Sequence, residues 1–288
     1  MALSRHNIPH YARLMRLDRP IGIYLLLWPT LWALMLAANG MPPIKELVLF
    51  VLGVVVMRSA GCVINDYADR HVDGAVKRTN SRPLVSGDVT AREALQLFSV
   101  LILIAFLIVI QLSWPTILLS GVALVLASIY PFMKRYTHLP QAVLGAAYGW
   151  AIPMAVMAVR GDIPEWGWLL FVANLLWTIA YDTLYAMVDR DDDLVVGIKS
   201  SAILFGSADK LIVGVLQVMT LGLLVAVFLL TDRGVFAYLG LAAAVMLFAH
   251  QHYCIRHRDR DACFKAFLDN HYVGMVVAIG LFIDLVIV

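Results

Sequence analysis

Three acidic residues recur at helical spacing just after the second long apolar segment of the chain. Asp66, Asp69 and Asp73 are separated by three and four residues, and Asn65 precedes them. On an α-helix, Asn65, Asp69 and Asp73 fall within an arc of about 80° and form one polar stripe. Carboxylates this close together repel one another and are costly beside a membrane. The stripe therefore predicts a divalent cation as partner, although a solvated acidic cap below a membrane helix would have the same pattern.

A second acidic stretch repeats this arrangement about 116 residues later. Asp182, Tyr185, Asp189 and Asp193 are spaced by three, four and four residues and again share one helical face. Because each stretch follows a long apolar run, the two look like copies of one unit. They predict a pseudo-symmetric bundle with a metal site shared between them. The candidate metal ligands are Asn65, Asp66, Asp69, Asp73, Asp189 and Asp193. The candidate catalytic residues are Asp69, Asp73, Asp189 and Asp193.

Basic residues near both stretches could hold a phosphorylated ligand. Arg58 lies seven residues before Asn65, within about 20° of the same helical face. An arginine this far inside an apolar segment is functional by default, unless it snorkels to the interface or only neutralises Asp69. The other basic residues are explained in part by the general excess of Lys and Arg in the cytoplasmic loops of membrane proteins. The candidate diphosphate ligands are Arg58, Asn65, Lys77, Arg78, Lys134, Arg135 and Lys199.

These residue types suit the chemistry of a lipid diphosphate. Mg²⁺ binds through a few carboxylates and keeps positions for water and phosphate, so two stripes predict Mg²⁺ ions that bridge a diphosphate. Basic side chains would contact the remaining phosphate oxygens. The C–O bond would ionise and leave an allylic carbocation in a dry, aromatic-lined cavity, where a nucleophilic acceptor captures it. The residues alone lead no further than a metal–diphosphate site in a membrane.

The elements that position these residues must be membrane helices. Apolar residues make up 61% of the 288 residues and charged residues only 15%, and the mean hydropathy is +0.82. Apolar runs near 20 residues recur without polar–apolar alternation, which predicts an all-α integral membrane protein rather than a barrel. We expect kinks at Pro29 and Pro153. The nine predicted spans are 21–39, 45–64, 95–113, 115–133, 140–159, 166–186, 210–230, 235–252 and 271–288.

The distribution of basic residues predicts the orientation of these spans. With nine spans, all but three of the 22 Lys and Arg residues lie on the side of the N-terminus or at the adjacent helix ends. The exceptions are Lys45, Arg160 and Arg233. This asymmetry predicts a cytoplasmic N-terminus, a periplasmic C-terminus and a central cavity that opens to the cytoplasm. We expect one domain over residues 1–288 in a bacterial inner membrane, no cleavable signal peptide, and no nucleic-acid partner.

The N-terminal lead-in, residues 1–20, has two interpretations. Its arginines and the apolar Leu14, Met15 and Leu17 predict an amphipathic segment on the membrane surface. Alternatively, Arg16 or Arg19 folds over the site.

Both acidic stretches resemble the motifs of the UbiA-type membrane prenyltransferases. The first matches N-D-x-x-D-x-x-x-D at Asn65, Asp66, Asp69 and Asp73, and the second matches D-x-x-x-D from Asp189. The resemblance covers essentially the whole chain. Within the family, the segments 14–22, 27–30 and 189–193 are most similar to those of bacterial members that prenylate 4-hydroxybenzoate. The resemblance implies Mg²⁺ dependence and transfer of a polyprenyl chain from polyprenyl diphosphate to the ring carbon ortho to the hydroxyl of 4-hydroxybenzoate, a step in ubiquinone biosynthesis.

Two alternatives remain at this point. The acceptor could be another aromatic compound, such as a naphthoate, homogentisate or haem. The chain could instead be a cation-coupled transporter, with the acidic stripes as its ion site. The clustering of acidic residues at one end of the helices argues against a transporter, because transporter sites usually lie near the middle of the membrane.

Overall fold

The computed structural model describes residues 3–71, 74 and 79–288, and this part of the chain contains helices and no strand. Nine helices of the described residues are long and apolar enough to cross a membrane, in agreement with the nine predicted spans. The principal helices are α1 (Ile8–Leu14), α2 (Ile21–Ala38), α3 (Ile44–Asp69), α4 (Pro83–Ser86), α5 (Ala91–Val109), α6 (Trp114–Ile129), α7 (Pro140–Gly149), α8 (Ala151–Arg160), α9 (Glu165–Val196), α10 (Ser201–Phe205), α11 (Asp209–Leu230), α12 (Val235–Cys254) and α13 (Arg260–Phe282).

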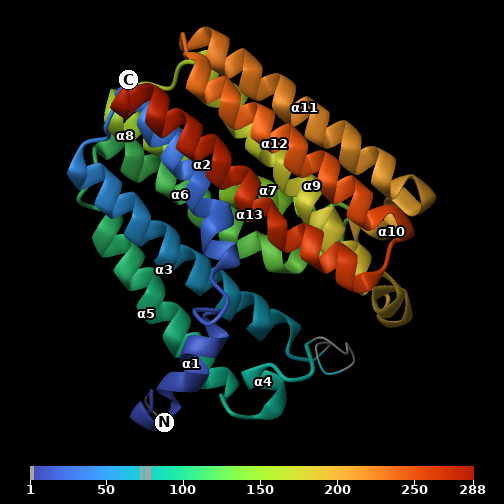
Figure 1. Cartoon of the computed structure of the whole chain (residues 1–288). Helices are drawn as coiled ribbons and strands as arrows, with labels where there is room; N and C mark the ends of the chain where they lie inside the picture. Colours follow the sequence, from blue (N-terminus) through green and yellow to red (C-terminus); the bar gives the residue numbers. More distant parts are fainter. Residues whose placement is uncertain (1–2, 72–73, 75–78) are drawn as a thin grey trace.

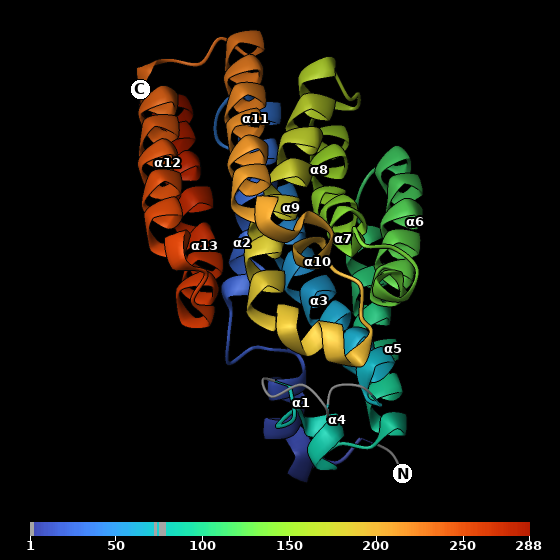
Figure 2. The same cartoon turned by 90° about the vertical axis from the view of Figure 1, so that its right-hand side faces the viewer.

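The long helices run side by side, with α1 and α4 below them at one end (Figure 1). The C-terminus lies at the opposite end. Figure 2 shows α12 and α13 at one edge of the bundle and α5 and α6 at the other. The helices that carry the two acidic stretches, α3 and α9, therefore lie in the middle of the molecule.

Aromatic packing fixes the position of α9 in the bundle. Trp177 of α9 stacks on Trp32 of α2, with ring centroids 5.6 Å apart. The indole nitrogen of Trp32 donates to the carbonyl of Gly274 at 3.1 Å, and that of Trp177 donates to Asn270 Oδ1 at 3.0 Å. Gly274 has to be glycine, because a Cβ there would lie 2.8 Å from Trp28. Indole groups buried in a bilayer need such partners, so these contacts bind α2, α9 and α13 together.

Two helices extend well beyond their predicted bounds. The span predicted at 166–186 ends at Val196 in α9, and the span predicted at 271–288 begins at Arg260 in α13. The predictions stopped where charged residues appear. Burial continues past that point, because Cys263, Ala266 and Asn270 follow one another at helical spacing and are all buried. As a result, α9 carries its whole acidic stretch as unbroken helix.

The fifth span is interrupted near its middle. Helix α7 ends at Gly149 and α8 begins at Ala151. Pro153 lacks an amide hydrogen, so it cannot donate the helical hydrogen bond to the carbonyl of Gly149. The predicted kink at Pro153 is thus confirmed as a break at Trp150. Pro29 lies inside α2, which continues through it.

The first interpretation of the N-terminal segment placed Leu14 against the membrane surface, but the structure buries this side chain inside the protein. Leu14 is fully buried and Tyr11 nearly so, in a cluster with side chains of α3 and α5. Leu17, by contrast, is 43% exposed. Helix α1 therefore packs against the bundle below the ends of α3 and α5.

Candidate functional site

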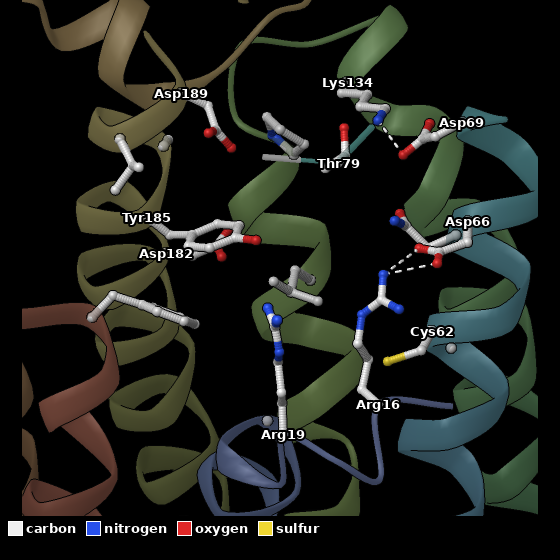
Figure 3. Close-up of a pocket in the computed structure, with 18 of the residues that line it drawn as sticks. Arg16, Arg19, Cys62, Asp66, Asp69, Thr79, Lys134, Asp182, Tyr185 and Asp189 are labelled. Atoms are coloured by element: carbon white, nitrogen blue, oxygen red, sulfur yellow. Dashed lines mark hydrogen bonds and ion pairs between the residues drawn. The ribbon is translucent and has the colours of Figure 1, made fainter. Parts of the chain in front are cut away.

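A cavity of about 780 Å³ lies between the ends of α3 and α9. Figure 3 shows Asp66 and Asp69 on the α3 side, and Tyr185, Asp182 and Asp189 on the α9 side, facing one another. Side chains of α7, α13 and the turn between α1 and α2 also line the cavity, together with residues of the segments 79–83, 130–134 and 198–200. The prediction that the two acidic stretches share one site agrees with this arrangement.

The acidic side chains of α3 are held by cations. Asp66 is only 2% exposed. Its carboxylate forms ion pairs with Arg16 Nη2 at 2.8 Å and with Arg82 Nη1 at 2.9 Å. Asp69, also buried, pairs through Oδ2 with Lys134 Nζ. Without these cations, two adjacent buried carboxylates would be strongly destabilising.

The wall formed by α9 carries the second stretch. Asp189 and Asp193 are both buried and line the cavity, together with Asp182 and Tyr185. At the rim, Arg260 of α13 pairs with Asp191 at 3.1 Å, and Asp191 itself is 78% exposed in its side chain. The stretch thus divides into members that face the cavity and members that face away from it.

The predicted phosphate-binding cations do not all reach the cavity. Lys134 and Lys199 line it, and so does Asn65. Arg135 is exposed and is not among the lining residues, because its guanidinium donates to the carbonyl of Ala68 at 2.8 Å and caps the end of α3. The predictions for Asp73, Lys77 and Arg78 fall outside the described residues.

Arg58 lines the inner part of the cavity. It lies 11 residues before the end of α3, which is about 16 Å along the helix axis. Its Nη1 donates to Cys62 Sγ at 2.6 Å, and its guanidinium lies 5.6 Å from the ring centroid of Tyr148. A Cβ at Gly22 would lie within 2.8 Å of atoms of the Arg58 guanidinium, so a larger residue there would displace this guanidinium. None of the ion pairs found among the described residues involves Arg58.

The donor set fits a divalent metal ion. Asp69 Oδ1 and Gln141 Oε1 are buried at the cavity and have no hydrogen-bond partner among the described residues. Unpartnered buried acceptors of this kind suit a cation or a ligand hydroxyl. Within the described residues, no three His, Cys, Asp or Glu side chains converge on one point. A metal ion between the two walls would therefore take part of its coordination from a ligand, as Mg²⁺ does from phosphate oxygens.

Several cavity residues were not among the predicted ligands. Arg82 and Arg16 contact Asp66, and Cys62 and Tyr148 contact Arg58. The alternative interpretation of the lead-in, in which Arg16 or Arg19 folds over the site, is confirmed in that both line the cavity. Tyr148 could not be recognised as a site residue from the sequence, because one tyrosine in an apolar segment looks like an ordinary core residue.

Known proteins resemble this chain over nearly its whole length. The model of the UbiA prenyltransferase family matches residues 26–278. The chain is 60% identical over 279 residues to the 4-hydroxybenzoate octaprenyltransferase of Chromohalobacter salexigens. The aligned residues cover 97% of this chain and 94% of the relative. The chain is also 60% identical over 281 residues to the 4-hydroxybenzoate octaprenyltransferase of Vibrio parahaemolyticus, with 98% and 99% covered.

Solved structures share the fold. The apo structure of a UbiA homolog from Aeropyrum pernix K1 superposes with a TM-score of 0.81 at 26% identity, covering 91% of this chain and 97% of that one. A UbiA homolog from Archaeoglobus fulgidus bound to GPP and Mg²⁺ superposes with a TM-score of 0.74 at 17% identity, with 95% and 99% covered.

Proposed function

Because the chain belongs to the UbiA prenyltransferase family, we propose that it transfers a polyprenyl chain from polyprenyl diphosphate to 4-hydroxybenzoate. The new bond forms at the ring carbon ortho to the hydroxyl, as a step in ubiquinone biosynthesis. One observation carries the proposal beyond family membership. Buried carboxylates on α3 and α9 face each other across one cavity, and those on α3 pair there with Arg16, Arg82 and Lys134.

The carboxylates are proposed to hold Mg²⁺ together with the donor diphosphate. Asn65, Asp66 and Asp69 would serve from α3, and Asp189 and Asp193 from α9. When bound, Mg²⁺ neutralises negative charge on the diphosphate and so makes it a better leaving group. Arg16 and Arg82 pair with Asp66 and Lys134 pairs with Asp69, and these cations would bind the remaining phosphate oxygens.

Aromatic side chains form the part of the cavity in which the allylic group would react. Tyr148, Tyr181 and Tyr185 line it, and Tyr185 packs on Phe267 of α13 with ring centroids 4.6 Å apart. When the C–O bond breaks, its electron pair leaves with the diphosphate, and the positive charge on the allyl group faces these rings. The aromatic walls also exclude water, which would otherwise capture the cation. The ring carbon of the acceptor then forms the new C–C bond and loses its proton.

Arg58 is proposed to bind the carboxylate of the acceptor. The sequence had suggested the diphosphate as its ligand. Three cations already surround the carboxylates at the outer end of α3, however, whereas Arg58 lies deeper, beside Tyr148. A guanidinium there offers two parallel hydrogen bonds to a carboxylate and holds the aromatic ring inside the cavity.

The proposed activity has a direct test. Purified protein with Mg²⁺, a polyprenyl diphosphate and isotopically labelled 4-hydroxybenzoate is expected to give a lipid-extractable product. Its mass should equal the sum of the acceptor and the prenyl group minus one proton, and no product should form when the metal is chelated. Product from a naphthoate or homogentisate, but not from 4-hydroxybenzoate, would assign a different acceptor. Absence of turnover with every acceptor would contradict the proposal.

We further propose that the whole chain acts as one membrane-embedded domain with a cytoplasmic N-terminus. In a variant in which the three native cysteines are replaced, Asp162→Cys should react with a membrane-impermeant thiol reagent added to intact cells. Ser86→Cys should react only after the cells are opened. Both residues are exposed. Ser86 ends α4 and Asp162 follows the end of α8, and Figure 1 shows these two helices toward opposite ends of the bundle. The reverse labelling pattern would place the cavity on the periplasmic side.

A further inference from the structure

We infer that a hydrogen-bonded cluster outside the cavity, made of Asn7, Tyr11 and Glu93, positions Arg16 for the donor diphosphate. We call it the α1 brace. The inference rests on the proposed function, because it takes Asp66 and Arg16 to lie where the diphosphate binds. The three members of the brace are positioning residues, since none of them lines the cavity.

Glu93 ties α1 to the start of α5. Its Oε1 accepts from the Tyr11 hydroxyl at 2.7 Å and from Asn7 Nδ2 at 3.0 Å. Its Oε2 accepts from the backbone amide and the hydroxyl of Thr90, which closes the capping box of α5. One buried carboxylate thus receives four hydrogen bonds, two from each segment. Burial raises the pKa of the Tyr11 phenol, so the hydroxyl stays protonated and continues to donate.

A tight turn connects the orientation of α1 to the side chain of Arg16. The amide of Arg16 donates to the carbonyl of Arg13, and the amide of Leu17 donates to the carbonyl of Ala12. These two bonds form a Schellman motif, in which glycine usually occupies the position that Arg16 takes here. Arg16 has a φ of 58°, a left-handed conformation that is unfavourable for a residue with a side chain.

Strain of this kind persists only where surrounding contacts hold it. In this turn the contacts are the brace on one side and the paired hydrogen bonds from Arg16 Nη2 to Asp66, at 2.8 and 3.0 Å, on the other. Helix α1 has only seven residues and ends two residues before Arg16, so we expect a shift of α1 to move Arg16 with it. A shift of α1 away from α5 would therefore pull the guanidinium away from Asp66.

Helix α1 also contacts the segment that supplies the second arginine of Asp66. Arg13 Nη2 donates to the carbonyl of Ser81 at 3.2 Å, next to Arg82. Arg82 in turn approaches Asp66 at 2.9 Å. The brace thus has a direct route to Arg16 and an indirect route to Arg82, and it touches neither substrate.

The test is donor binding measured without acceptor, using geranyl diphosphate with Mg²⁺ and isothermal titration. Tyr11→Phe removes one hydroxyl and keeps the ring. It is expected to weaken donor binding by about threefold to tenfold, and Arg16→Ala by about 10- to 150-fold. The double variant should lose less binding free energy than the sum of the two single losses, because the brace acts largely through Arg16. In turnover assays with acceptor, Tyr11→Phe should raise the KM for the donor and leave the KM for the acceptor unchanged.

A matched control separates positioning from general loosening of the fold. Thr116→Val also removes one buried hydroxyl while keeping shape, at the far end of the bundle, where Thr116 bonds Ser113 at 2.8 Å. It should leave donor binding unchanged even if it lowers the Tm as much as Tyr11→Phe does. Wild-type donor binding in Tyr11→Phe, additive effects in the double variant, or an equal loss in Thr116→Val would each overturn the inference. If the wild-type protein itself bound no geranyl diphosphate, the proposed function would fail instead.

Discussion

Asparagine in place of Asp69 or Asp189 is expected to lower Mg²⁺-dependent prenyl transfer by about 100-fold or more, because charge stabilisation of this kind is usually the largest catalytic contribution. Each substitution keeps the shape of the side chain and removes one negative charge from a wall of the cavity. Asp69 and Asp189 are both buried and come from different helices. A loss of transfer activity in both variants would therefore show that both walls of the cavity are needed for the reaction. The measurement is the transfer rate as a function of Mg²⁺ concentration.

Asp191→Asn provides the matched control on the same helix. Asp191 belongs to the second acidic stretch, but its side chain is 78% exposed and pairs with Arg260 at the rim. Its substitution should leave the rate within about twofold of wild type, because exposed ion pairs contribute little. Near-normal rates and unchanged Mg²⁺ dependence in Asp69→Asn and Asp189→Asn, with folding verified in detergent, would show that the stripes are only solvated caps.

Arg58→Ala is expected to raise the KM for 4-hydroxybenzoate by about 10- to 150-fold, while the KM for the polyprenyl donor changes much less. A hydrogen bond to a charged group contributes roughly 1.5–3 kcal/mol, which corresponds to that range. Arg58→Lys should recover only part of the loss, because an ammonium group lacks the planar pair of donors. Steady-state kinetics with each substrate varied in turn would measure both constants.

Two further results bear on Arg58. Arg160→Ala is a suitable control, since Arg160 is exposed, pairs with Asp162 at 3.1 Å and lies at the other end of the bundle. It should leave both KM values unchanged. If Arg58→Ala instead raised the KM for the donor, Arg58 would be a diphosphate ligand, as its helical alignment with Asn65 first suggested. Unchanged constants for both substrates would make it a structural charge.

Local sequence patterns were sufficient to predict the helices and the acidic stripe of α9, whereas α3 ends at Asp69, before the last member of the first predicted stripe. Nine apolar segments follow from length and hydropathy alone, and Asp189 and Asp193 share a face simply because they are four residues apart. That α3 and α9 face one cavity followed from treating the stretches as a repeat, since both were expected at corresponding helix ends. The identity of the acceptor came from the resemblance to a family and not from residue spacing.

Contacts between distant segments could not be predicted in the same way. Arg16 and Asp66 are 50 residues apart, and their contact depends on a left-handed turn that no glycine marks. Arg135 and Lys134 are neighbours in sequence, yet only Lys134 reaches the cavity, because the short helix that carries them turns the two side chains in different directions. Helix ends were misplaced for a related reason. Hydropathy responds to the first charged residues, whereas burial depends on which face those charges occupy.

The length of α9 determines where in the membrane the reaction would take place. Its 32 residues correspond to about 48 Å, and the hydrocarbon layer is only about 30 Å thick. The last turns, which carry Asp189 and Asp193, would therefore lie among the lipid headgroups. A water-soluble acid and a water-insoluble isoprenoid could meet there without either leaving its own phase. Each buried methylene group of the attached chain contributes about 0.8 kcal/mol to membrane partitioning. The same bond that completes the reaction would thus transfer the aromatic ring from the aqueous pool to the bilayer, while the pyrophosphate returns to water.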